Sequence, residues 1–378
     1  MPSVYQLLPT TDGGKPDEQL TRKIKREKIK KILFHVLAVS AIMVIAAQGL
    51  RAFIRSSERF LQYGGKGCHG MQRNLSSLPS HYSLPSGDKI PSVALGCWKS
   101  SPGEVGQAVK AALNAGYRHI DDAWIYGNEK EVGKAIKDSG VPRDQLFITS
   151  KLWNSFHAPE DIEPALDESL KALDTEYVDM YLIHWPIAWK KDENVLDKEL
   201  TANPYPTWQK LEELVDKGKI RNIGISNFNI ARVKNLTGNA LKYQPAVNQV
   251  ELNFFNPQPE LLKWSKDNGI LLEAYSPLGS NDNVKKALSV PEVQEIATEL
   301  GITPAQVVIS WHVQRGTIVL PKSVTPSRIE ENLHVFKLPD DLFEKLENAS
   351  VSHPPQRTLN PSKSWNLGFD VFDEKWPF

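Results

Sequence analysis

The sequence predicts an α/β fold, a (β/α)8 TIM barrel with an N-terminal β-hairpin. Eight short apolar runs recur from about residue 82 onward, and amphipathic segments separate them. Nearly continuous apolar runs are typical of parallel strands, because helices cover both faces of a parallel sheet. Several of the amphipathic segments end at glycine, as helices commonly do. Eight such repeats indicate a sheet that closes into a barrel.

The composition is that of a globular protein with a large core. Of the 378 residues, 40% are hydrophobic and 24% are charged, and 45 Lys and Arg balance 45 Asp and Glu. Because the chain has no net basic charge, no nucleic-acid partner is expected. The two cysteines, Cys68 and Cys97, form neither a disulfide framework nor a CxxC site, and no histidine spacing indicates a bound metal.

The segment before the barrel is expected to contain a membrane anchor. Residues 1–31 form a polar and basic tail, predicted to be disordered, and residues 32–50 are apolar without Asp, Glu, Lys or Arg. About 20 apolar residues span a bilayer, so 32–50 is predicted to be a single transmembrane helix in contact with lipid. The basic run at 21–31 outweighs Arg51, Arg55 and Arg59 on the other side, which predicts a cytosolic N-terminus.

Residues 51–81 are interpreted as a linker to the barrel domain, 82–378. A second interpretation is that translation starts near Met71, just before the hairpin. The protein would then lack the anchor and be cytoplasmic.

The hairpin is predicted at YSLPSGDKIPSVAL, residues 82–95, because SGDK separates two short runs as a turn does. The expected barrel strands follow at 92–97, 119–123, 146–152, 178–185, 222–228, 246–253, 270–279 and 317–323. The expected helices between them include 102–116, 160–174, 207–218, 259–269, 290–301 and 303–316. After residue 350 the chain is irregular and aromatic, and this tail is expected to fold over the active site.

Four polar residues follow successive predicted strands. Asp121 and Tyr126 come after the second strand, Lys151 ends the third and His184 ends the fourth. Because active sites of such barrels lie at the carboxyl ends of the strands, these side chains are expected to meet at one mouth. Singly, each has an ordinary interpretation as a helix cap, a solvated cation, a packing ring or a core histidine. Together, they predict a catalytic group.

The chemistry of this group is a proton transfer. A tyrosine phenol has a pKa near 10 and is a usable acid when a neighbouring ammonium stabilises the phenolate. Lys151 would provide that ammonium, Asp121 would hold it, and His184 would orient a carbonyl oxygen. Such a group can protonate an alkoxide as hydride reaches carbon. Side chains cannot supply hydride, so a nicotinamide cofactor is expected.

The chain resembles the aldo-keto reductase family. The resemblance runs from about residue 82 to the end, and the segments that carry it are GYRHIDDAWIYGNEKEVG (116–133), SKLW (150–153), LIHWP (182–186), GISNFN (224–229), NQVELN (248–253), AYSPLG (274–279) and LPKSVTPSRIEEN (320–332). Within the family it is most similar to the fungal branch of NADP-dependent glycerol dehydrogenases and glyceraldehyde or xylose reductases. Asp121, Tyr126, Lys151 and His184 fall on the family's catalytic tetrad, with Tyr126 as the proton donor.

The resemblance also implies a cofactor site. Ser226, Asn227 and Gln249 would bind the nicotinamide carboxamide, and the nicotinamide ring would stack on Tyr275. The residues implied around the pyrophosphate and the adenosine are Ser276, Leu278, Ser280, Lys322, Ser323, Arg328, Glu331 and Asn332. Two cations and a hydroxyl at a helix start suit a phosphate monoester, so NADPH/NADP+ is expected rather than NADH. Alternatively, 320–332 is only a capped surface helix.

The substrate pocket is expected to be aromatic. Trp98, Ile125 and Trp185 are predicted to line it beside His184, and Trp365 and Phe369 are candidates from the tail, although each tryptophan could instead fill the core. The sequence departs from the family at Asp122, where a small residue is usual. This carboxylate could turn toward the helices or compete for Lys151.

The expected function is reversible, NADPH-dependent reduction of aldehydes and ketones by a monomer. The substrate class extends to small aldehydes, aldoses and the glyceraldehyde and glycerol pair, so carbonyl compounds and polyols are both expected to bind. The alternative is a membrane-tethered regulatory or sensing subunit that binds the cofactor with little turnover. The complete tetrad favours the enzyme.

Overall fold

A computed structural model of the chain describes residues 77–193, 195–280 and 282–375. These residues belong to one unit, Arg73–Phe378. The predicted tail at 1–31, the predicted transmembrane helix at 32–50 and most of the predicted linker lie outside the described residues. Within the described ranges, no helix is long and apolar enough to cross a membrane.

Eight parallel strands make up the main sheet in this part of the chain, and each corresponds to one predicted apolar run. They pair in the order β12-β11-β10-β9-β6-β5-β4-β3. Their bounds are β3 Leu95–Gly96, β4 His119–Asp121, β5 Phe147–Leu152, β6 Val178–Ile183, β9 Ile220–Ser226, β10 Val247–Glu251, β11 Leu271–Tyr275 and β12 Ile318–Leu320.

The first and last strands meet, which closes the sheet. Val93 and Val319 form a parallel bridge, and the backbone N–H of Gly96 donates to the oxygen of Pro321 at 3.2 Å. A Cβ at Gly96 would lie 3.1 Å from the oxygen of Leu320, so glycine allows the two strands to approach this closely. The predicted eight-stranded parallel barrel is therefore confirmed.

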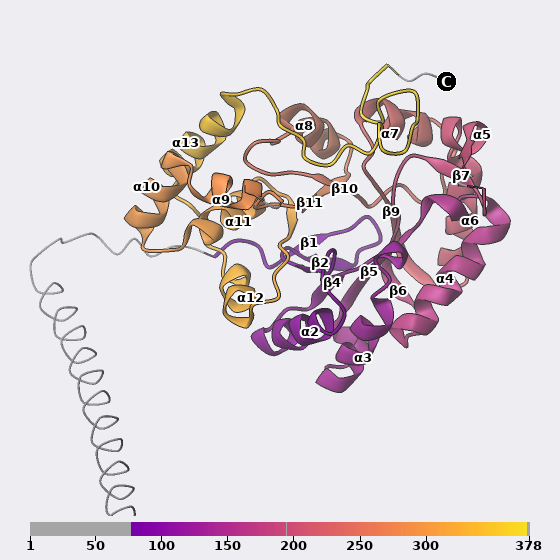
Figure 1. Ribbon diagram of the computed structural model, residues 1–378, viewed down its shortest axis with the longest axis horizontal. Helices are drawn as coiled ribbons and strands as arrows, with labels where there is room; N and C mark the ends of the chain where they lie inside the picture. The colour runs from indigo at the N-terminus through magenta and orange to yellow at the C-terminus, as the bar shows by residue number, and fades with distance from the viewer. Residues whose placement is uncertain (1–76, 194, 281, 376–378) are drawn as a thin grey trace, which may run out of the picture. The chain divides into compact units, whose positions relative to one another are not determined.

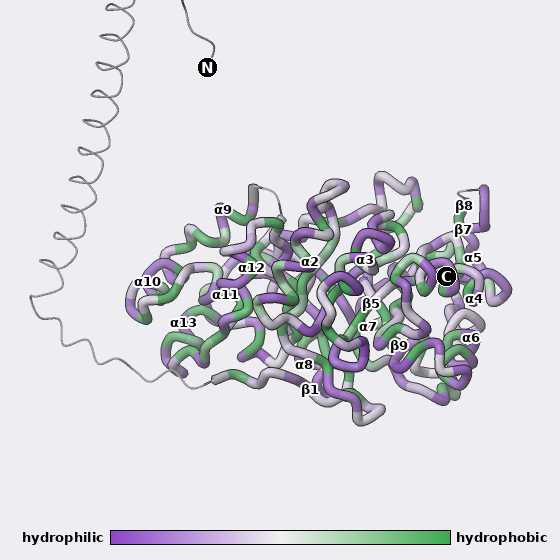
Figure 2. The backbone as a smooth tube through the Cα atoms, turned by 90° about the horizontal axis from the view of Figure 1, so that it is seen from below, coloured by the Kyte–Doolittle hydropathy of each residue, from purple (hydrophilic) through white to green (hydrophobic). Residues whose placement is uncertain are grey.

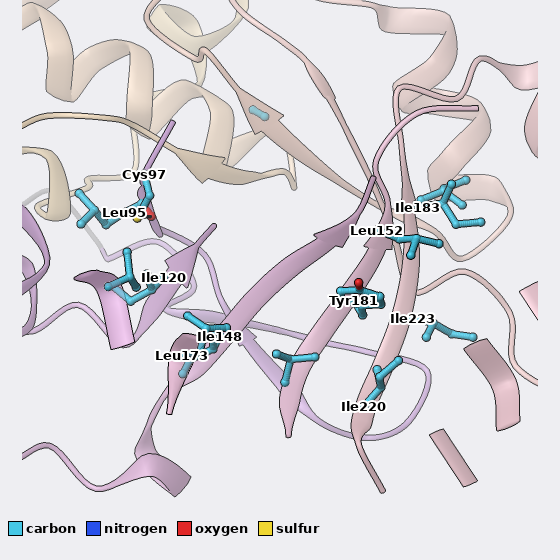
Figure 3. Packing of buried hydrophobic residues seen from close by; sticks show 14 of the residues in the cluster. Leu95, Cys97, Ile120, Ile148, Leu152, Leu173, Tyr181, Ile183, Ile220 and Ile223 are labelled. Carbon is cyan, nitrogen blue, oxygen red and sulfur yellow. Dashed lines mark hydrogen bonds between the residues drawn. The ribbon is translucent and has the colours of Figure 1, made fainter. Parts of the chain in front are cut away.

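Helices surround the barrel on its outside (Figure 1). Those that follow the barrel strands are α2 Glu104–Ala115, α3 Glu129–Ser139, α4 Pro159–Leu173, α6 Tyr205–Asp216, α7 Ile230–Thr237, α8 Pro259–Asp267, α11 Pro304–Gln314 and α12 Pro326–Leu333. Hydrophobic and hydrophilic residues alternate along them (Figure 2), so each helix can bury one side and expose the other. The buried side packs on outward-facing strand residues such as Ile120, Ile148 and Ile223 (Figure 3).

The predicted hairpin is present and covers the amino end of the barrel. β1 (His81–Ser83) pairs antiparallel with β2 (Lys89–Pro91). Leu84 and Ile90 of the hairpin pack in one cluster with Phe147 and Ile318, which begin β5 and β12. The opposite end of the barrel is left for the site.

Some elements were not predicted from the sequence. After β6 the chain forms a second hairpin, β7 (Ala188–Lys190) with β8 (Val195–Asp197), and a short helix α5 (Lys198–Ala202). Further helices are α9 (Asp282–Leu288) and α13 (Asp340–Val351), while α10 (Pro291–Leu300) matches the predicted helix at 290–301. Short 3-10 helices lie at η1 Trp124–Tyr126, η2 Arg143–Gln145 and η3 Asn154–Phe156.

The described part of the tail after α13 has no helix or strand, as expected. In Figure 1 this yellow segment passes α8 and ends beside α7. The side-chain amide of Asn229, the residue before α7, donates to the backbone oxygens of Phe372 and Asp373 at 3.3 and 2.9 Å. The tail is thus tied to the carboxyl end of the barrel.

Candidate active site

A cavity of about 1270 Å³ lies at the carboxyl ends of the barrel strands. Most of the predicted site residues line it: Trp98, Asp121, Ile125, Tyr126, His184, Trp185, Ser226, Asn227, Gln249, Tyr275, Ser276, Leu278, Ser280, Lys322, Ser323, Arg328, Glu331 and Asn332. Two predicted site residues do not line the cavity. Lys151 is fully buried beneath the cavity, and Phe369 packs beside the tryptophans without lining it.

Lys151 is the centre of the predicted catalytic group. Its ammonium donates to Asp121 Oδ2 at 2.9 Å, to the backbone oxygen of Asp122 at 2.8 Å and to the Tyr126 hydroxyl at 3.4 Å. An ammonium without water requires such partners, because burying an unpaired charge is costly. The structure therefore brings Asp121, Lys151 and Tyr126 into contact, and Asp121 has the cation that the sequence suggested.

The surroundings keep Lys151 charged and Tyr126 protonated. Burial lowers the pKa of the Lys151 ammonium, but Asp121 and Tyr126 raise it more, and it stays above its ordinary value. Burial raises the pKa of the Tyr126 phenol, and Lys151 opposes this shift without overcoming it. The sequence predicted that the ammonium would stabilise the phenolate, and it did not predict the opposing effect of burial on the phenol. Tyr126 is therefore held as a proton donor, with a cation beside the oxygen that would lose the proton.

His184 completes the group as a neutral imidazole. Its ring centroid lies 5.8 Å from that of Tyr126 and 5.3 Å from that of Trp153, each in an edge arrangement. Burial, followed by the nearby charges of Lys151 and His157, moves the pKa of His184 well below its ordinary value. The side-chain amide of Asn227 donates to the backbone oxygen of His184 at 2.9 Å, which fixes the strand end that carries the ring.

Asp122 does not compete for Lys151. Successive residues of a strand face opposite sides, so Asp121 faces the barrel interior and Asp122 faces the helices. The carboxylate of Asp122 accepts from the backbone N–H of Ala123 at 3.0 Å. Burial, followed by the charge of Glu129, raises its pKa well above the ordinary value. This departure from the family pattern therefore lies outside the cavity.

Glu273 is a buried acid that the sequence reading missed. The side-chain nitrogen of Gln249 donates to Asp121 Oδ1 at 2.7 Å and to Glu273 Oε2 at 2.8 Å, so it links the two carboxyl groups. Burial, with the charge of Asp121 next, raises the pKa of Glu273 to about 8. The signal in the sequence was the spacing Glu273-x-Tyr275, which places both side chains on one face of β11.

Cys97, at the end of β3, is 1% exposed. Burial, and then the charges of Asp122 and Asp121, raises the pKa of its thiol well above the ordinary value. This cysteine is therefore an unreactive thiol that packs in the core.

One wall of the cavity carries the groups expected to bind the nicotinamide. The Tyr275 hydroxyl donates to Asn227 Oδ1 at 2.8 Å, and the Ser226 hydroxyl donates to the backbone oxygen of Gln249 at 2.8 Å. Asn227 has φ of 66°, a conformation that asparagine tolerates better than most residues. Both amide hydrogens of Gln249 point at carboxyl groups, so its oxygen is left to accept from a ligand. An aromatic ring beside amide and hydroxyl groups fits a carboxamide-bearing ring.

The other end of the cavity is cationic. Lys322 and Arg328 are exposed, and among the described residues neither forms an ion pair. Arg328 lies in the first turn of α12, whose N-terminal N–H groups favour anions. Within the same described ranges, no group of three or more His, Cys, Asp or Glu could hold a metal ion. Two cations beside the N–H groups at the start of α12 fit the phosphate groups of a ligand.

Tryptophans form the end of the cavity next to His184. Trp98 and Trp185 were predicted here, and Trp365 of the tail also lines the wall. Trp153 was missed as a pocket residue, although it follows the third strand directly and so had the same positional signal as Lys151. Ile125 is 39% exposed at the rim.

Comparisons with known proteins agree on one family. A profile of the Aldo/keto reductase family matches residues 92–350. The chain is 45% identical over 306 residues to a Saccharomyces cerevisiae protein named glycerol 2-dehydrogenase (NADP(+)), an alignment that covers 77% of this chain and 96% of the relative. It is 45% identical over 271 residues to the Homo sapiens aldo-keto reductase family 1 member A1, covering 67% and 83% of the two chains.

The chain is also similar to a solved structure. The aldose reductase from Schistosoma japonicum superposes with a TM-score of 0.71 at 37% sequence identity. The match covers 80% of this chain and all of that one.

Proposed function

Because the chain belongs to the aldo/keto reductase family, we propose that it is an NADP-dependent oxidoreductase that reduces aldehydes and ketones to alcohols. The observation that carries the proposal is the contact of Lys151 with both Asp121 and Tyr126 at the base of the cavity. A partly buried phenol beside a buried ammonium is suited to giving up a proton and stabilising the oxygen left behind.

When bound, NADPH supplies the hydride that reaches the carbonyl carbon. Ser226, Asn227 and Gln249 would hold its carboxamide, and Tyr275 would lie against its ring. Lys322, Ser323 and Arg328 would bind the phosphate that distinguishes it from NADH. The other residues assigned to the cofactor, from Ser276 to Ser280 and at Glu331 and Asn332, also line the cavity.

Tyr126 donates its phenolic proton to the carbonyl oxygen as the alkoxide forms. Lys151 stabilises the resulting phenolate, and Asp121 keeps Lys151 in place. Neutral His184 offers a ring N–H to the same oxygen and orients it. In the reverse direction, the same groups accept the proton of an alcohol.

We propose small aldehydes, aldoses and the glyceraldehyde and glycerol pair as the substrates. The tryptophan wall would pack against the carbon chain, while the hydroxyl of Ser364, which also lines the cavity, offers an acceptor for hydroxyl groups. Reduction of DL-glyceraldehyde with NADPH, and oxidation of glycerol with NADP+, would test both directions.

The first test of the mechanism is Tyr126→Phe. Loss of the general acid should lower turnover of NADPH with aldehydes roughly 10²- to 10⁴-fold. Binding of NADPH, followed by quenching of protein fluorescence, should be retained. Tyr205→Phe is the matched control, because its hydroxyl bonds only the backbone oxygen of Ala240, away from the cavity. Undiminished turnover in the Tyr126→Phe protein would contradict the mechanism.

The membrane anchor at 32–50 and its cytosolic N-terminus stay predictions, since these residues lie outside the described part of the chain. So do the cytoplasmic alternative with a start near Met71 and the monomeric state. Fractionation of the tagged full-length protein, with endoglycosidase digestion, would locate the barrel. Light scattering would report its oligomeric state.

A further inference from the structure

The C-terminal tail forms part of the cavity wall, although it has no regular structure of its own. The tail residues that line the cavity are Thr358, Leu359, Asn360, Pro361, Ser364 and Trp365. Within this segment the backbone N–H of Trp365 donates to the oxygen of Pro361 at 2.8 Å, and that of Leu367 to the oxygen of Ser362 at 3.1 Å. These bonds form a local turn, so the attachment of the turn to the barrel depends on partners elsewhere.

Glu251, the last residue of β10, is such a partner. Its side chain is fully buried. Oε1 accepts from the backbone N–H and the hydroxyl of Thr358, both at 2.8 Å, and Oε2 accepts from the backbone N–H of Leu359 at 2.8 Å and from that of Thr358 at 3.1 Å. Bonds to an ionised carboxylate are stronger than neutral ones, so this one side chain fixes the point where the tail enters the cavity wall.

Glu251 lies where it can position the tail beside the substrate pocket, and it does not contact the groups that transfer the proton. It lies on the same face of β10 as Gln249, two residues nearer the mouth of the barrel. Its carboxylate bonds tail atoms and the side chain of Asn253, and none of Lys151, Tyr126 and His184. In the sheet Glu251 lies opposite Tyr275 of β11. The positive charge of Arg357, whose guanidinium lies 3.6 Å from the ring centroid of Phe372, interacts with the carboxylate.

Seven residues after this anchor, Trp365 packs into the aromatic end of the cavity. Its ring centroid lies 5.9 Å from Trp153, 5.1 Å from Trp185 and 5.0 Å from Trp189, all in edge arrangements. Trp153 in turn contacts the ring of His184. A single aromatic ring therefore separates the tail from the residue that would orient the carbonyl group.

We propose that Glu251 is a positioning residue for the substrate pocket. It ties residues 358 and 359 to the end of β10 and thereby holds Trp365 as the outer wall against which the substrate packs. This deepens the proposed function and rests on it. Glu251 governs the affinity for carbonyl substrates, whereas hydride transfer, proton transfer and cofactor binding do not depend on it.

The central experiment replaces Glu251 with glutamine in the full chain. Glutamine keeps the shape but removes the charge and turns one acceptor oxygen into a donor facing an N–H group. The KM for aldehyde should rise at least roughly tenfold. The kcat and the Kd for NADPH should stay close to the parent values. Hydrogen exchange read by mass spectrometry should accelerate in the peptide that covers 358–365. An unchanged KM, or unchanged exchange in this peptide, would overturn the proposal.

A double-mutant cycle with Trp365→Ala tests whether Glu251 acts through the tail. If it does, Trp365→Ala raises KM and the double variant is no worse than the more impaired single variant. Two independent effects that multiply in the double variant would overturn the proposal.

Two further variants separate positioning from loss of folding. Glu347→Gln changes a partly buried glutamate of α13 that accepts from Trp311 Nε1 at 2.8 Å and pairs with Arg315 at 3.0 Å, and should leave KM unchanged because Glu347 does not line the cavity. An equal rise in KM there would overturn the proposal. Thr358→Val removes only the hydroxyl bond to Glu251 and should raise KM about threefold, even if Glu251→Gln fails to fold. No rise in KM for a folded Thr358→Val protein would count against the proposal.

The experiments can contradict the role of Glu251 and the proposed function separately. If the parent protein turns over no aldehyde, the proposed function is wrong, and faster exchange at 358–365 in the Glu251→Gln protein still shows that Glu251 holds the tail. If the parent is active but exchange in this segment does not change, only the role of Glu251 is wrong.

Discussion

Each ionisable side chain inside the barrel has neighbours that stabilise one of its protonation states. Lys151 is fully buried and charged, since Asp121 and a backbone oxygen contact its ammonium. Glu273, two hydrogen bonds away through Gln249, is raised to a pKa of about 8 and is mostly neutral at pH 7. One ammonium is thus balanced by one carboxylate, and a second negative charge is avoided.

The protonation of Glu273 can be tested by the pH dependence of the free energy of unfolding in a variant that lacks this carboxyl group. Its pKa is raised from 4.5 to about 8 on folding, so between these values the folded protein binds a proton that the unfolded chain has lost. This contribution disfavours folding increasingly as pH rises from about 5 to 8, by an amount on the order of a few kcal/mol. Glu273→Gln should therefore gain stability relative to the parent as pH rises from 5.5 to 8.5, measured by urea unfolding.

Glu344→Gln is the control for the Glu273 variant. The Glu344 side chain is exposed on α13, so its replacement should shift stability equally at both pH values. A difference between the Glu273→Gln protein and the parent that is the same at pH 5.5 and 8.5 would contradict the assigned titration.

Individual site residues could be predicted from the sequence where their position at the end of a strand determines that they face the cavity. Asp121, Lys151 and His184 could be predicted because each ends a strand of a recognisable barrel. Glu251 and Glu273 could not be assigned roles in the same way. The strand pattern places Glu273 on one face with Tyr275, but it does not identify the partners of the two glutamates, Gln249 and Thr358, which belong to other segments of the chain.

At the scale of elements, α3 and α4 pack unusually closely at Gly133. A Cβ on Gly133 would lie 2.6 Å from the backbone carbon and oxygen of Leu173, the last residue of α4. Gly133→Ala should therefore force the helices apart and destabilise the protein by about 1–3 kcal/mol, measured by urea unfolding.

Gly106 in α2 provides the comparison for Gly133. The atoms nearest to a Cβ there belong to the side chain of Glu131, at 3.0 Å and beyond. This side chain accepts from the backbone N–H groups of Gly103 and Gly106, and it can shift by a few tenths of an ångström while keeping these bonds. The gain in helix propensity, about 0.5–1 kcal/mol, should offset that shift, so Gly106→Ala should change stability little. Equal losses in the two variants would show that close backbone packing is not the cause.

The start of α12 should decide between the two forms of the coenzyme. Arg328→Ala removes an exposed guanidinium from the cationic end of the cavity, and the affinity for NADPH should fall roughly 10- to 100-fold. The affinity for NADH should hardly change, because the phosphate that Arg328 would bind is missing from it. Fluorescence titration measures both, with Lys337→Ala, outside the cavity, as control. Equal weakening of both coenzymes would contradict the assignment.

Strands and regular helices could be predicted from their periodicity, whereas the insertion after β6 could not. The segment that forms β7, β8 and α5 combines two three-residue strands with a five-residue helix. Such short elements depend on contacts with their neighbours, here Trp189 on Trp153 and Trp365, rather than on a repeating pattern of their own.

For the molecule as a whole, the barrel contains every described residue that lines the cavity, from Gly96 to Trp365. A chain that starts at Met71 should therefore keep its kcat/KM for aldehyde with NADPH within about twofold of the full-length protein, because domains with their own core usually fold alone. Parallel assays of the two purified proteins measure this. A loss of activity with intact folding would show that residues before Met71 contribute to the site.

The family and the barrel could be predicted as a whole because eight strand signals and seven motifs agree in order. The closure between β3 and β12 depends on contacts such as Gly96 with Leu320, which join positions more than 200 residues apart. The course of the tail was predicted only in outline. Its anchors at Asn229 and Glu251 are formed by tertiary contacts.

The buried Cys97 has a chemical consequence for a protein that handles aldehydes. Unsaturated aldehydes and peroxides attack thiolates, and Cys97 is the one cysteine in the described barrel, sealed in the core with its thiol protonated. The folded barrel therefore offers electrophiles no accessible sulfhydryl to alkylate, and oxidative conditions that inactivate thiol-dependent enzymes should leave its catalysis intact.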